Sequence, residues 1–336
     1  MTEFVALLLG SAFVSAAPLI MAGLGEMFLE RSGAGFNLGI EGILLCGALA
    51  GVLGSAAAGP WAGLVAGLLA GLVWGLLYAV CAALGLDIVL IGITISIAGA
   101  GLSTYVFQVI APTGRTNISA PLLPTLPVPG LSDLPVLGAP FRALGIGLWL
   151  AIGLAIVSAW ILRSTRFGLR LRAADDGETA ALRGIAIGRY RLAAALIAGA
   201  LAGVAGAVLA VGTIGSFTPL MSGGRGFLVL AVVIIGRRTT RGVVAGALLF
   251  AGMDGLALLA QTRDLGLPTE AYHALPYAAA LAVLCAHSRW QTHRSTKIVT
   301  DAITNSRSTT IEADSALPGP QANATIPHRV KGDSHG

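Results

Sequence analysis

The chain has 336 residues, of which 55% are hydrophobic and only 11% are charged, and its mean hydropathy is +0.83. Soluble domains carry about 25% charged residues, so this composition excludes a water-soluble fold. The net charge of +5 does not indicate a partner nucleic acid, because almost all basic residues are arginines in short segments between apolar stretches. Such a pattern is typical of membrane topology signals.

Apolar stretches of about 20 residues, the length that crosses a bilayer, recur from the N-terminus to residue 288. They predict an all-α polytopic membrane helix bundle of about 8–10 transmembrane helices over residues 1–290. The candidate spans are 4–25, 37–56, 59–84, 88–111, 144–162, 192–212, 226–236, 242–261 and 274–288. Because the stretch 226–236 is short, we interpret it as either a half-helix or part of a broken helix.

Loop charges predict the orientation of the bundle. Met1-Thr2-Glu3 has no basic region before the first apolar stretch, which predicts a retained helix rather than a cleaved signal peptide. Arginines are concentrated on alternate connections between spans: Arg31, then seven between residues 163 and 191, then Arg237, Arg238 and Arg241. The positive-inside rule therefore predicts that the N-terminus lies outside and the C-terminus lies in the cytoplasm.

Two segments differ from the apolar spans. Residues 112–143 contain seven prolines, which suppress regular hydrogen-bonded structure, so we expect an extended external loop. Residues 291–336 are rich in Ser, Thr, Asn, Asp and Lys, and we expect a disordered cytoplasmic tail.

Glycine spacing predicts close helix packing. In the third span, glycines recur at every fourth residue, at Gly59, Gly63, Gly67, Gly71 and Gly75, and the sixth span has Gly199 and Gly203. Such a stripe allows another helix to approach closely. A short echo between Ser32–Phe36 and Ser222–Phe227 fits either inverted repeats or coincidence in a glycine-rich chain.

The sequence contains none of the motifs that would indicate an enzyme. It has no G-x-x-x-x-G-K-[ST], no H-E-x-x-H, no G-x-S-x-G and no Cys/His cluster. Cys46, Cys81 and Cys285 lie far apart within apolar stretches and are predicted to be small buried side chains. We therefore expect no catalytic residue, no metal site and no cofactor bound by this chain.

The polar segment 163–191 contains a candidate docking helix. Asp175 or Asp176 can cap a short helix with Glu178 in its first turn, which continues through Ala181 and Leu182 and ends near Gly184. Such a helix is too short to be stable alone and needs a partner surface. Alternatively, the segment is an ordinary loop whose arginines fix the topology.

A few polar residues within the spans are candidates for a solute pathway, because ionisable groups in membrane helices are costly. Glu41 and Asp254 line the pathway or have structural partners, which for Glu41 would be Arg31 or a backbone amide. Uncharged groups suit a neutral ligand, and Phe217 or Tyr105 can stack on a base. The candidates are Asn37, Glu41, Thr94, Ser96, Gln108, Ser216, Phe217 and Asp254, with Ser103, Thr104 and Thr218 nearby in sequence.

Three motifs carry a resemblance to a known family. The run Glu30–Gly42, "ERSGAGFNLGIEG", resembles the "ERSG-x-x-N-x-G-x-EG" signature of permease subunits in nucleoside and simple-sugar ABC importers. The segment 165–191 is similar to that family's coupling loop. Ser222–Gly236, "SGGRGFLVLAVVIIG", resembles its "G-x-G-F-x-A-L-A-x-x-x-x-G" stretch.

The resemblance implies a subunit that moves a nucleoside or simple sugar inward by alternating access across the bacterial plasma membrane. A separate ATPase subunit uses the ATP and engages the helix from Glu178 to Leu182. The resemblance also implies a second, longer permease subunit that forms a heterodimer with this chain, and an extracytoplasmic substrate-binding lipoprotein. Rival interpretations are an ion-coupled secondary transporter with Glu41 and Asp254 as coupling carboxylates, an ABC permease for branched-chain amino acids, and a membrane scaffold that does not transport.

Overall fold

A computed structural model describes residues 2–111, 116–125, 145–182, 184–262 and 278. All of them lie in one compact unit, Met1–Leu284. The tail 291–336, most of the proline-rich segment 112–143 and all of the span predicted at 274–288 except residue 278 lie outside the described residues.

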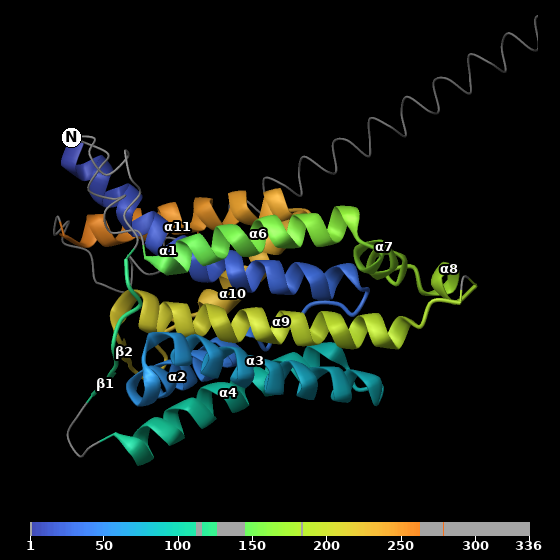
Figure 1. The fold of residues 1–336 in the computed structure, drawn as a ribbon, viewed down its shortest axis with the longest axis horizontal. Helices are drawn as coiled ribbons and strands as arrows, with labels where there is room; N and C mark the ends of the chain where they lie inside the picture. Colours follow the sequence, from blue (N-terminus) through green and yellow to red (C-terminus); the bar gives the residue numbers. More distant parts are fainter. Residues whose placement is uncertain (1, 112–115, 126–144, 183, 263–277, 279–336) are drawn as a thin grey trace, which may run out of the picture. The chain divides into compact units, whose positions relative to one another are not determined.

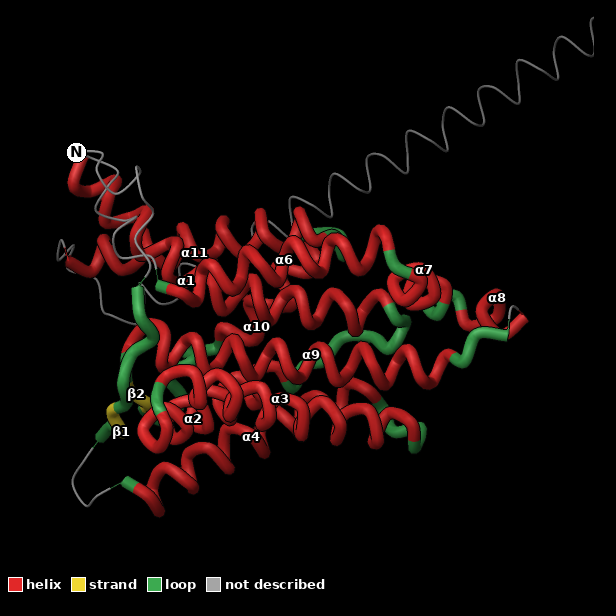
Figure 2. Tube along the Cα trace, viewed as in Figure 1, coloured by secondary structure: helices red, strands yellow, loops and turns green. Residues whose placement is uncertain are grey.

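The described part of the chain is a helix bundle (Figure 2). Its long helices are α1 (Thr2–Arg31), α2 (Ile40–Ala58), α3 (Pro60–Ala83), α4 (Ile88–Ile110), α6 (Ile146–Ser164), α9 (Ile187–Leu209) and α11 (Thr240–Thr262). Its shorter elements are α7 (Arg166–Ala173), α8 (Gly177–Leu182), the π-helical turn η1 (Ala210–Ile214), α10 (Arg225–Ile235), and the strands β1 (Ile118–Ser119) and β2 (Ser216–Phe217). Among the described residues, seven helices are long and apolar enough to cross a membrane. The predicted fold class is confirmed, and the chain is a multi-pass membrane protein.

The helices divide into a central group and an outer group. The apolar spans of α1, α2 and α9 are each more than 70% buried, whereas those of α3, α4 and α6 are only 28% buried. Figure 1 shows α9, in yellow, running through the bundle, and α9 packs against α1, α2 and α3. The outer helices therefore expose leucine, isoleucine and valine side chains on the surface of the bundle.

Glycines set the spacing between α3 and α9, as the sequence predicts. A Cβ atom on Gly71 would collide with the backbone oxygen of Gly199, and one on Gly203 would collide with that of Gly67. These two helices therefore meet backbone to backbone. Gly59 has a different role: it lies between α2 and α3 with a φ of 90°, a conformation that favours glycine.

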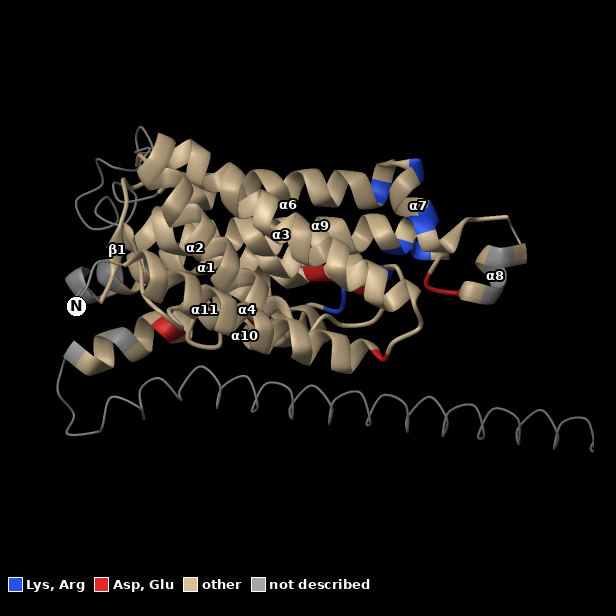
Figure 3. Cartoon of the chain, turned by 90° about the horizontal axis from the view of Figure 1, so that it is seen from below, with Lys and Arg blue, Asp and Glu red and all other residues tan. Residues whose placement is uncertain are grey.

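The arginines in the described part of the chain gather at one end of it. Figure 3 shows basic residues, in blue, around α7, and contacts of Arg31 and Asp175 with Arg238 place the C-terminus of α1 and the turn between α10 and α11 at the same end. Arg225, at the start of α10, is the exception among the described arginines. We call this end the arginine-rich end; β1 and β2 pair at the opposite end.

Two helix boundaries differ from the predicted ones by five residues or more, and both differences have a physical reason. α1 continues to Arg31, beyond the predicted end at residue 25, because its carboxylates are compensated: Glu26 accepts a hydrogen bond from the Asn37 backbone N–H and Glu30 pairs with Arg238. α9 begins at Ile187, five residues before the predicted span 192–212. Its basic residues there lie on the surface, where long charged side chains reach water.

Candidate functional site

The loop that follows α1 turns back into the bundle. Leu38 packs against Gly92 of α4, and Gly39 packs against Ile95, one turn further along the same helix. Ile95 is about 10 Å from the start of α4, at about 1.5 Å per residue. α2 therefore begins inside the bundle rather than at its end.

Asn37 shapes this loop. Its backbone N–H donates to Glu26 Oε1 at 2.6 Å, and its side-chain oxygen accepts from the Gly39 N–H at 2.8 Å. Both Glu26 and Asn37 are almost fully buried. These hydrogen bonds turn the chain into α2, and a role for Asn37 in the solute pathway stays a prediction.

Glu41 joins the start of α2 to the start of α10. Its carboxylate accepts hydrogen bonds from the Ser222 hydroxyl, from the Gly224 N–H at 2.9 Å and from the Gly226 N–H at 2.7 Å. The first N–H groups of a helix lack partners within that helix and carry a partial positive charge. Glu41 therefore caps α10 from a distant part of the chain, and backbone amides are the partners that the sequence proposed for it as one alternative.

The approach at this contact is tight. A Cβ atom on Gly226 would lie 2.5 Å from the Glu41 nitrogen, so a larger residue would separate the two helices. We call the group formed by Glu41, Ser222, Gly224 and Gly226 the helix junction. Two helices that begin within the bundle meet at it, an arrangement that secondary transporters use to build solute sites near the bilayer midplane.

A charged pair lies beside the junction. Arg225, the first residue of α10, pairs with Asp254 of α11 at 2.9 Å, and each side chain is about one quarter exposed (26% and 24%). The structure therefore brings Glu41 and Asp254 to the two sides of the same helix start. A paired and hydrogen-bonded arrangement lowers the cost of keeping charges within a membrane bundle.

The other pathway candidates lie elsewhere. On α4, Thr94 and Gln108 are exposed on the face that also carries Tyr105, and we call these three residues the α4 polar strip. Ser96 lies close to the junction, since its backbone packs against Gly42 of α2. Ser103 is buried and donates to the Ala100 carbonyl oxygen, a common arrangement for serine in helices.

Ser216 and Phe217 form β2 at the end opposite the arginine-rich end. Ser216 pairs with Ser119 of β1, and Phe217 is fully buried with its ring centroid 5.8 Å from that of Phe107. The structure therefore does not bring these two residues to the junction.

The predicted docking helix is present as α8. It starts immediately after Asp176 and ends at Leu182, which is 90% exposed, and Gly184 follows with a φ of 68°. The carboxylate of Asp175, one residue further from α8, pairs with Arg238 at 3.1 Å; which of the two aspartates caps the helix stays a prediction. The side chains of Glu178 and Ala181 lie outside the described part of the structure.

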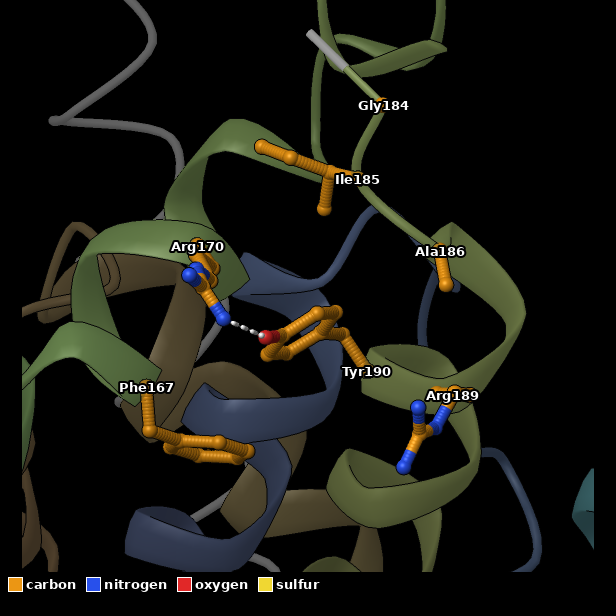
Figure 4. A pocket seen from close by; sticks show the side chains of 7 residues that line it. All are labelled: Phe167, Arg170, Gly184, Ile185, Ala186, Arg189 and Tyr190. Atoms are coloured by element: carbon orange, nitrogen blue, oxygen red, sulfur yellow. Dashed lines mark hydrogen bonds between the residues drawn. The ribbon is translucent and has the colours of Figure 1, made fainter.

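A cationic pocket of about 530 Å³ lies between α7 and the start of α9 (Figure 4). Arg170 donates to the Tyr190 hydroxyl at 3.3 Å, and the Phe167 and Tyr190 rings are 5.8 Å apart. Its lining residues are Phe167, Arg170, Gly184, Ile185, Ala186, Arg189 and Tyr190. Among the described residues, this lining contains two guanidinium groups and no carboxylate, so the pocket suits an acidic side chain.

Several residues of these sites were missed by sequence reasoning. Glu26 and Glu30 fall outside the predicted first span, although two carboxylates one helical turn apart directly before the Ser32–Gly42 motif are a usable signal. Ser222 and Arg225 fall in the segment that resembles the family stretch. Their partners, however, are distant in sequence and have no local pattern.

The fold, with two helices that begin inside the bundle and a short helix projecting from the arginine-rich end, fits a membrane transport permease. Residues 8–284 match the family described as branched-chain amino acid transport system / permease component. The chain belongs to this family and is a permease subunit of an ABC transporter.

Three relatives have informative names. The nucleoside ABC transporter permease protein NupC of Lactococcus lactis is 32% identical over 75% of this chain and 82% of its own length. The guanosine ABC transporter permease protein NupQ of Bacillus subtilis is 31% identical, with coverage of 76% and 83%. The putative glucose ABC transporter permease protein TsgC13 of Haloferax volcanii is 33% identical, with coverage of 80% and 82%.

Proposed function

We propose that this permease subunit moves a neutral nucleoside or simple sugar inward by alternating access. The names of the relatives support this solute class. The observation that carries it in the structure is the helix junction, where Glu41 already occupies the start of α10 and Arg225 is paired with Asp254. A solute carboxylate or phosphate would compete with these carboxylates for the same positive groups. The junction therefore favours a neutral solute over a branched-chain amino acid.

The solute pathway runs between this chain and a second permease subunit. Support comes from the α4 polar strip, since Thr94, Tyr105 and Gln108 would be poorly placed against lipid. A partner permease facing α4 would enclose a polar passage that leads toward the junction. Membrane lipid covers the remaining apolar surfaces of the outer helices.

The energy comes from a separate ATPase subunit, and this chain binds no cofactor of its own. The ATPase docks on α8, where Leu182 projects, and on the cationic pocket beside it. By the positive-inside rule, the arginine-rich end faces the cytoplasm of a bacterial cell, with the N-terminus outside. A substrate-binding lipoprotein delivers the solute at the opposite end.

A solute panel tests the proposal. The full complex, with its ATPase, second permease and binding lipoprotein, is reconstituted in proteoliposomes and supplied with ATP. We expect uptake of labelled guanosine or glucose and little uptake of leucine or guanosine monophosphate. Uptake of leucine in preference to the neutral solutes would contradict the assignment of the solute class.

A further inference from the structure

The turn between α10 and α11 is held in an unusual conformation. Arg237 and Arg238 both have left-handed backbone angles, with φ of 51° and 56°. Residues with a side chain adopt this region at a cost, and they keep it only where surrounding contacts determine it. The contacts of Arg238 can hold the turn in this conformation.

Arg238 connects three segments at the arginine-rich end. Its Nε lies 2.8 Å from Glu30 Oε1, and its guanidinium also pairs with Asp175 at 3.1 Å. A third nitrogen-to-oxygen contact runs from Arg238 to the Glu30 backbone oxygen at 3.2 Å, and Arg31 donates to the Arg238 backbone oxygen. We call Glu30, Arg31, Asp175 and Arg238 the Arg238 clasp.

The clasp holds the base of the projecting helix α8. Asp175 lies two residues before α8 begins, and its backbone packs against Gly33, where a Cβ atom would lie 2.9 Å from the Asp175 Cα. Gly33 has a φ of 69°, which glycine adopts without strain. A displacement of α8 would therefore act on the loop that leads to α2 and on Arg238.

α10 connects the clasp to the helix junction. The helix has 11 residues, about 16 Å at about 1.5 Å per residue. Glu41 holds its first N–H groups, and the turn containing Arg238 follows its last residue. Between these ends, Val232 and Val233 are fully buried, and Gly23 of α1 packs against both. Carboxylates therefore hold both ends of α10. Glu41 accepts from its first N–H groups, and Glu30 and Asp175 pair with Arg238 just after its last residue.

We propose that Arg238 is a positioning residue that transmits movement of α8 to α10, and thereby to the helix junction. This inference rests on the proposed function, because it needs an ATPase that moves α8. Breaking the clasp leaves ATP hydrolysis in place and separates it from solute movement. Arg238 touches neither the solute nor ATP in this account.

The test measures solute moved per ATP hydrolysed by the full complex in proteoliposomes. Arg238→Gln and Asp175→Asn are expected to lower this ratio by roughly 3- to 10-fold while the amount of assembled complex stays unchanged. Arg238→Lys should give an intermediate ratio, because a single ammonium group does not reproduce the forked contact to two carboxylates. Arg237→Gln is the matched control: it removes the same charge from the same turn, and its ratio should equal that of the wild type.

Two results would overturn the inference. The first is an unchanged ratio in both Arg238→Gln and Asp175→Asn. The second is a parallel fall of transport and hydrolysis in step with the yield of folded complex, which is the effect of a structural role alone. If the wild-type complex transports and the variants keep its ratio, only the role of Arg238 fails. If the wild-type complex itself moves no solute with ATP, the proposed function fails as well.

Discussion

The helix junction and the projecting α8 differ in how many of their side chains have partners within this chain. At the junction, Glu41 meets one hydroxyl and two backbone N–H groups of another helix, and glycine is the residue that fits at the contact. At α8, Leu182 is 90% exposed, and the neighbouring pocket presents two guanidinium groups. The contacts of the first region are made within this chain, whereas the second leaves an apolar side chain and two cations on the surface, where the proposed ATPase would bind. Changes at the junction should therefore alter stability, and changes near α8 should alter association.

The largest effect is expected from Glu41→Ala. The substitution leaves two N–H groups and a hydroxyl without their acceptor inside the bundle, and each such loss costs about 1–3 kcal/mol. Thermal unfolding in detergent should show a strong loss of stability, with transport abolished. Glu41→Gln keeps one acceptor oxygen and should be milder. A Glu41→Ala protein as stable and active as the wild type would show that the junction is not the structural contact described here.

The second-largest loss of stability is expected from Gly226→Ala. Its Cβ would lie 2.5 Å from the Glu41 nitrogen, and overpacking of this kind costs about 1–3 kcal/mol. The matched control is Gly153→Ala on α6, where a Cβ would meet no atom within 4 Å. Thermal unfolding should separate the two: the control should be neutral or slightly stabilised, since alanine is the better helix former. Equal unfolding temperatures would contradict the close approach of α2 and α10.

Leu182→Asp should leave the stability of the isolated permease within about 0.5 kcal/mol, as expected for an exposed position. Its affinity for the ATPase should fall by about 10- to 100-fold, because a buried apolar anchor of an interface would be replaced by a charge. The measurement is equilibrium binding of the ATPase to the permease in nanodiscs. Leu220→Asp, at another exposed leucine, serves as the control and should bind normally. Unchanged binding by Leu182→Asp would count against α8 as the docking helix.

The smallest effect is expected at the cationic pocket. Arg170→Ala and Arg189→Ala should each slow association with the ATPase by about 2- to 5-fold and weaken its dependence on salt, as charges at the rim of an interface do. Arg163→Ala removes the same charge near the pocket without belonging to its lining, and its association rate should change less. Equal effects of all three substitutions would mean that general positive charge, rather than the pocket, attracts the partner.

Local sequence patterns predicted the parts of this protein that depend on nearby residues. The apolar stretches located the long helices, and the turn residues around Asp176 and Gly184 located α8 because capping and helix ends are local properties. The hydropathy pattern predicted an end of α1 at residue 25, because it treats Glu26 and Glu30 as unpaired charges. Their partners, Asn37 and Arg238, lie outside the local pattern.

Local patterns could not predict contacts between residues that are distant in sequence. Glu41 accepts a hydrogen bond from Ser222, 181 residues away, and Asp175 pairs with Arg238, 63 residues away. The echo between Ser32–Phe36 and Ser222–Phe227 offered one hint, with coincidence as its alternative. In the structure both segments lead into helices that start at the junction, one from the arginine-rich end and the other from the end that holds β2. Only the fold brings them together.

The central claim is that this chain supplies the passage and a partner supplies the energy. The most direct test compares solute uptake into proteoliposomes containing this permease alone, and containing it together with its ATPase, second permease and binding lipoprotein. Our account predicts uptake by the full complex when ATP is on the side of the arginine-rich end, and a protonophore should not affect this uptake. The permease alone should take up no solute. Uptake by the permease alone that collapses with a protonophore would contradict it and would identify an ion-coupled carrier.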